Sequence, residues 1–90
     1  MFARRLTFYV EGPQGKSLVP KAWLDRFFMR NFTGHRTLDE TLPVADGVVE
    51  AGFRVSAEEA ASRLEAWLRG QKLLGPDERL RVESTPPESA

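Results

Sequence analysis

The fold of this chain is decided by residues 46–59, which read DGVVEAGFRVSAEE. The Asp46-Gly47 pair predicts a two-residue hairpin turn, because Gly accepts a positive φ and Asp tolerates one. The strand that follows carries its apolar residues on one face, at Val49, Ala51, Phe53 and Val55. Ser56 and Glu59 have capping-box spacing, so each can satisfy a free backbone N–H of the other at a helix start. The stretch therefore predicts a turn, a strand and a helix in direct succession.

The segment before this stretch predicts one more strand and one more helix. Alternation of apolar and polar residues over 5–11 indicates a strand, and Gly12-Pro13-Gln14-Gly15 ends it as a loop. A helix is expected to begin between Ser17 and Pro20, with Ser17 as a candidate N-cap. Its apolar residues recur at helical spacing: Trp23, Leu24, Phe27, Phe28 and Phe32.

Residues 36–44 are expected to form the other strand of the hairpin. Counting back from the turn pairs Val44 with Val49, Leu42 with Ala51 and Leu38 with Val55. These partners share a face, which explains the apolar pattern. Pro43 predicts an edge strand, because proline cannot donate a hydrogen bond to a ladder.

The second helix is predicted from an apolar stripe that begins at Ala57 and ends at Leu68, with Gly70 and then Gly75-Pro76 closing it off. A last short strand around Leu80 and Val82 follows it. Glu59 with Arg63, and Glu65 with Arg69, have the spacing and order of favourable pairs on a helix, each contributing about 0.2–0.5 kcal/mol.

The expected order of elements is β-α-β-β-α-β, which predicts an α+β fold. The known arrangement for this order is the ferredoxin-like two-layer sandwich, an antiparallel sheet with strand order 4-1-3-2 and both helices on one face. We expect one domain over residues 1–84 and a disordered tail over 85–90, where the sequence has little to bury.

The composition narrows the classes of function. The 13 basic and 13 acidic residues cancel, which disfavours a nucleic-acid binder. The chain has no cysteine and one histidine, so we expect no disulfide, no metal site and no cofactor. No segment is long and apolar enough to span a membrane, and we expect a cytoplasmic location. The preference for Arg over Lys favours a bacterial source.

Two short motifs resemble the acylphosphatase family of small ferredoxin-like enzymes that cleave acyl phosphates. Val10-Glu11-Gly12-Pro13-Gln14-Gly15 is similar to the family signature V-x-G-x-V-Q-G-V-x-[FYW]-R, but one residue shorter. Residues 42–50 resemble its N-x-x-D-G-x-V-E hairpin. The resemblance implies an anion-binding loop, here Gln14, Gly15 and Lys16. The family's phosphate-binding arginine has no counterpart after Gly15, and Lys16 supplies only a point charge.

The first helix has more apolar residues than one sheet needs to cover, which leaves two interpretations. They pack against the second helix and loops, or they form a surface for a partner. We name as partner-binding residues Trp23, Phe27, Phe28 and Met29 on this helix, with Tyr9 and Arg54 on the sheet. An RNA-type role for Tyr9 is disfavoured because the sheet lacks the further outward aromatics that base stacking requires.

No set of side chains converges for catalysis, and we predict no catalytic residue. The sequence favours a non-catalytic domain that acts by self-association, as a homodimer, or by binding another protein. The alternative is an acylphosphatase-like protein that binds or hydrolyses a small anionic ligand at residues 12–17.

Overall fold

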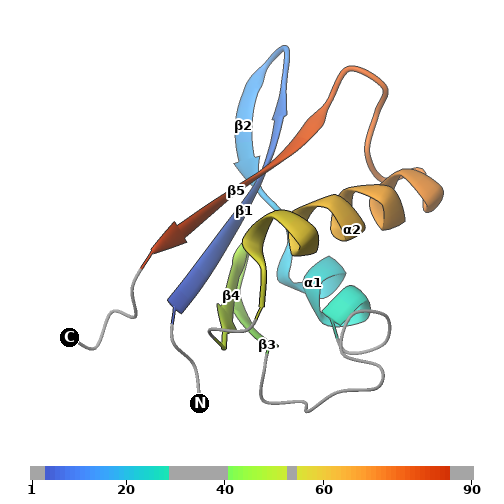
Figure 1. Ribbon diagram of the computed structural model, residues 1–90. Coiled ribbons are helices and arrows are strands. Elements are labelled where there is room, and N and C mark those ends of the chain that lie inside the picture. Colours follow the sequence, from blue (N-terminus) through green and yellow to red (C-terminus); the bar gives the residue numbers. More distant parts are fainter. Residues whose placement is uncertain (1–3, 29–40, 53–54, 86–90) are drawn as a thin grey trace.

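The computed structural model describes residues 4–28, 41–52 and 55–85. In this part of the chain the elements are β1 (Arg4–Gly12), β2 (Gly15–Leu18), α1 (Lys21–Phe27), β3 (Thr41–Ala45), β4 (Val48–Ala51), α2 (Ala57–Gly70) and β5 (Arg79–Thr85). They form an antiparallel sheet and two helices, which confirms the predicted α+β class (Figure 1).

Strand β1 is the centre of the sheet, and its two edges are used differently. One edge pairs with β5 from Arg5 to Glu11. The other edge is shared, with β4 along the first half of β1 and β2 along the second half. The change of partner falls at Phe8, whose N–H donates to the carbonyl of Gly47 at 2.7 Å and whose carbonyl accepts from the N–H of Val19 at 3.2 Å. The backbone of β1 is therefore paired along both edges (Figure 1).

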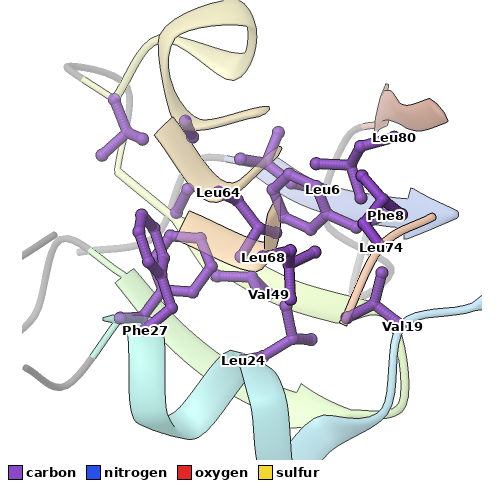
Figure 2. Close-up of a cluster of buried hydrophobic side chains, with 14 residues drawn as sticks. Leu6, Phe8, Val19, Leu24, Phe27, Val49, Leu64, Leu68, Leu74 and Leu80 are labelled. Carbon is purple, nitrogen blue, oxygen red and sulfur yellow. The ribbon is translucent and has the colours of Figure 1, made fainter. Parts of the chain in front are cut away.

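The core lies between the sheet and the helices. Leu6 and Phe8, alternate residues of β1, are fully buried. Figure 2 shows them in one cluster with Leu24 and Phe27 of α1 and Leu64 and Leu68 of α2. Aromatic rings join its parts, because Phe28 lies 5.9 Å from Phe8 and 5.0 Å from Phe27 between ring centroids. Both helices thus share a single core with the sheet.

The Asp46-Gly47 turn holds three parts of the molecule together. Gly47 has φ +74°, and a Cβ there would lie 2.7 Å from Cδ2 of Leu18 and 3.0 Å from the carbonyl oxygen of Phe8. Only glycine fits this position without strain. Oδ1 of Asp46 accepts a hydrogen bond of 2.9 Å from the N–H of Lys21 at the start of α1. Because Pro20, the N-cap residue, makes no side-chain cap, Asp46 supplies one from a distant part of the chain.

The helix start predicted at Ser56 is confirmed, and the structure shows the serine half of the predicted capping box. Ser56 is the N-cap, and its Oγ accepts from the N–H of Glu59 at 3.1 Å. The two predicted ion pairs of the helix are also present: Glu59 with Arg63 at 3.7 Å and Glu65 with Arg69 at 2.9 Å.

Two local predictions are wrong: the structure of residues 15–18 before α1, and the register of the hairpin between β3 and β4. Residues 15–18, expected as loop and helix start, form strand β2, and α1 begins only at Lys21. The hairpin register is also shifted, since Pro43 rather than Val44 pairs with Val49. A bulge between Pro43 and Ala45 inserts one extra residue, and a one-residue slip exchanges the faces of a strand. Leu42 therefore lies opposite Glu50 rather than Ala51 and is exposed. The expected pairing of Leu38 with Val55 lies outside the described residues.

Candidate functional site

On the first helix, the described residues that were expected to bind a partner are buried or half-buried. Phe27 and Phe28 are buried, with exposures of 3% and 0%. The ring of Phe27 lies 5.6 Å from that of Trp67 on α2, so the surplus aromatics fill the space between the helices. Trp23 is half-buried against the same core. Met29 and Arg54 lie outside the described residues.

Gln14, Gly15 and Lys16, the expected anion-binding loop, belong to a tight hairpin between β1 and β2. Gly12 pairs with Gly15, and Lys16 pairs with Glu11. Gly15 and Lys16 therefore run in a ladder with β1, and Gln14 lies in the turn that joins the two strands. The ammonium of Lys16 lies over the ring of Tyr9, 4.8 Å from its centroid.

A hollow of about 470 Å³ lies beside this hairpin, and its charges do not favour an anion. Its walls carry the ammonium of Lys16 together with the carboxylates of Asp77 and Glu78. Oε1 of Glu78 accepts from the N–H of Gly75 at 2.6 Å, so this carboxylate closes its own turn. Arg69 of α2 connects the helix to the same turn, because its guanidinium donates hydrogen bonds to the carbonyls of Gly75 at 2.9 Å and Glu78 at 2.7 Å. The nearby side chains thus stabilise the turn.

Tyr9, the remaining expected partner residue, lies on the face of the sheet turned away from the core, here called the open face. It consists of every second residue of β1 from Arg5 to Glu11 and of the residues opposite them. Along β1 its rows 1 to 4 are Arg5 with Glu50 and Thr85, Thr7 with Val48 and Glu83, Tyr9 with Leu18 and Arg81, and Glu11 with Lys16 and Arg79. None of these side chains is fully buried in the described part of the chain. Leu42 and Ala45 of β3 extend rows 1 and 2.

Ion pairs connect the strands of the open face. Nη2 of Arg5 donates to Oε2 of Glu50 at 3.0 Å, and Nε of Arg81 donates to Oε1 of Glu11 at 2.6 Å. The hydrogen bond and the charge of Arg81 lower the pKa of Glu11 below its ordinary value of 4.5. The hydroxyl of Tyr9 in row 3 donates a hydrogen bond of 3.4 Å to Glu83 in the neighbouring row 2. Charged groups of both signs therefore lie side by side on the open face and pair across its strands.

Large exposed apolar side chains gather at one side of this face. Within residues 4–28, 41–52 and 55–85 they are Leu18, Leu42 and Val44, between 39% and 45% exposed. Leu18 and Leu42 belong to the open face, and Val44 lies in the bulge of β3. Sequence reasoning missed Leu18 and Leu42 because it placed one near a helix start and the other in the core. The register of the strands is the signal that would have found them.

Comparisons with protein-family models, curated proteins and solved structures found no match to this chain. The resemblance to acylphosphatases therefore depends only on the short motifs of residues 10–15 and 42–50. The described residues contain no group of three His, Cys, Asp or Glu side chains that could hold a metal ion. Neither described helix is long and apolar enough to cross a membrane.

Proposed function

We propose that this chain is a non-catalytic binding domain that acts by contact with protein, and that the open face is its contact surface. The observation that carries the proposal is the position of Leu18 and Leu42, which remain about two-fifths exposed beside half-buried Val48 on an ordered sheet. Burying such side chains against a partner gains free energy in proportion to the apolar area removed from water.

The charges of the open face favour a protein partner over a nucleic acid. Its cations are Arg5, Lys16, Arg79 and Arg81, and its anions are Glu11, Glu50 and Glu83. Phosphate backbones require a surplus of positive charge, whereas this surface nearly balances the two signs. The ammonium of Lys16 also lies over the ring of Tyr9, where it would compete with the stacking of a base.

We also infer that the domain belongs to the ferredoxin-like class. The pairing of β5 with β1, β1 with β4 and β4 with β3 supports this assignment, as does the core shared by both helices. In this interpretation β2 is an addition to the common arrangement, placed on the edge of β1 that β4 leaves free.

Site-specific photocrosslinking in cells that produce the chain tests the proposed contact surface. A photoreactive amino acid at Leu42 probes the open face, and one at exposed Ala66 of α2 is the matched control. We expect a defined protein adduct from position 42 and none from position 66. No adduct from position 42, or the same adducts from both, would contradict the proposal.

A further inference from the structure

We propose that the occupant of the open face is a second copy of this chain, stacked face to face about a two-fold axis that runs across the strands. This inference depends on the proposed function and names its partner. It follows from the order of charges along the four rows, which the strand registers fix.

The geometry of such a pair is simple. Two sheets stack about 10 Å apart, and aligned stacking keeps their strands within about 30° of each other. A two-fold axis between the sheets, across the strands and midway between rows 2 and 3, reverses the direction of every strand. β1 and β5 then lie over their own copies, and β4 lies over β2 of the second copy. Row 2 faces row 3 of the second copy, and row 1 faces row 4.

The charges match in this arrangement. On β5, Glu83 of row 2 faces Arg81 of the second copy. At the other side of β1, Glu50 of row 1 faces Lys16 of row 4. On β1 itself, Arg5 faces Glu11. Each of these contacts joins opposite charges, and the symmetry makes each of them twice.

A second aligned arrangement, with the two-fold axis along β1, is disfavoured by the same charges. An axis along β1 would keep each row opposite itself, so Arg5 would face Arg5 and Glu11 would face Glu11. It would also bring Arg79 of β5 over Lys16 of β2. Like charges placed opposite each other are unfavourable, and the pattern therefore selects the axis across the strands.

The apolar residues agree with this arrangement, and the size of the face sets the expected affinity. Val48 of row 2 faces Leu18 of row 3 in the second copy. Four rows about 6.8 Å apart, on three strand positions about 4.8 Å apart, give a contact of about 400 Å² per copy. A stable interface buries about 800 Å² per partner, so we expect a dimer that dissociates on dilution.

Two charge reversals test the inference: Glu83→Arg and Arg81→Glu. In the first variant the guanidinium introduced at position 83 would face Arg81 twice, and in the second the carboxylate introduced at position 81 would face Glu83 twice. We expect either change to raise the dissociation constant of the homodimer by at least about 30-fold, because two attractive contacts become repulsive. Glu58→Arg, the same change of charge on exposed α2, should leave it unchanged.

Mixing the two variants distinguishes docking from a damaged fold. In a mixed pair, the guanidinium introduced at position 83 of one chain faces the carboxylate introduced at position 81 of the other. The native Arg81 of the first chain faces the native Glu83 of the second, so both contacts are attractive again. Sedimentation equilibrium should therefore show monomers for each variant alone and dimers for their equimolar mixture, with circular dichroism confirming that both are folded. A mixture that stays monomeric would overturn the inference, as would a wild-type chain that stays monomeric up to about 1 mM.

Photocrosslinks from a photoreactive amino acid at Leu18, which faces Val48 of the second copy, separate this inference from the proposed function. An adduct of twice the chain mass supports the second copy. An adduct with a different protein, together with a monomeric wild type, would overturn the second copy and retain the open face as a contact surface.

Discussion

The two faces of β1 are built from alternate residues of the same nine-residue strand, and they are satisfied in opposite ways. On the inner face Leu6 and Phe8 are fully excluded from water and pack in one core with residues of both helices. On the open face Arg5, Tyr9 and Glu11 keep partial exposure and are joined to neighbouring strands by ion pairs and a hydrogen bond. The inner face thus holds the fold, whereas the open face presents an ordered pattern of charge.

The largest effect should come from emptying the inner face. Phe8→Ala removes a fully buried ring that contacts Phe28, and we expect it to cost about 3–5 kcal/mol in the free energy of unfolding. Thr7→Ala, one residue away on the open face, should cost less than about 1 kcal/mol. Urea denaturation followed by circular dichroism measures both. Equal losses for the two variants would show that the faces do not differ in this way.

A second prediction concerns the Asp46-Gly47 turn, which lies against β1 and β2. Gly47→Ala should cost about 1–3 kcal/mol, because its φ of +74° strains an L-residue and its Cβ would press on Leu18 and the backbone of Phe8. Gly70→Ala, at the end of α2 with nothing within 4 Å of its Cβ, should instead gain up to about 1 kcal/mol. Thermal unfolding of both variants checks the sign. A stabilising Gly47→Ala would contradict the close approach of β2 to the turn.

The ion pairs of the open face predict a dependence on pH. Arg81 lowers the pKa of Glu11, so the stabilisation from this pair is present above pH 4.5 and is lost as the pH falls through the lowered pKa. An NMR titration of the Glu11 carboxyl carbon should give a midpoint below 4.5, and Arg81→Gln should move it upward. A midpoint that does not change in the variant would show that Arg81 is not the cause.

The smallest expected effect is that of inorganic phosphate, whose titration tests the phosphate-binding alternative. Because Asp77 and Glu78 line the hollow beside Lys16, inorganic phosphate should cause no saturable NMR shift of the amides of residues 12–17. Lys16→Gln is the matched control, since any weak nonspecific effect of its charge should disappear in it. A saturable shift in the wild type that Lys16→Gln abolishes would favour the acylphosphatase-like interpretation.

Local signals of the sequence were sufficient where the interaction itself is local. The Ser56 cap and the two ion pairs of α2 join residues three or four apart, and all three are present. Strand β2 could not be predicted, because its four residues are all exposed and carry no apolar alternation. The contact of Asp46 with Lys21 joins residues 25 positions apart, and only the folded chain brings them together.

The same distinction between local and long-range contacts decides how much of the candidate site the sequence could predict. Alternation along β1 placed Tyr9 on the outer face, but the positions of Leu18 and Leu42 required the bulge of β3 and the pairing of β2. The aromatic residues of α1 exceed what a helix needs when it packs against a sheet alone. Once Trp67 of α2 packs on Phe27, the sequence pattern describes a core.

The most direct test of the account is a dilution series of the wild-type chain followed by methyl NMR. We expect the methyl signals of Leu18 and Val48 on the open face to shift with concentration, and those of Ala66 on α2 and Leu64 in the core to stay fixed. Concentration-dependent shifts at Ala66, with none at Leu18 and Val48, would contradict the claim that the open face is the surface through which the protein acts.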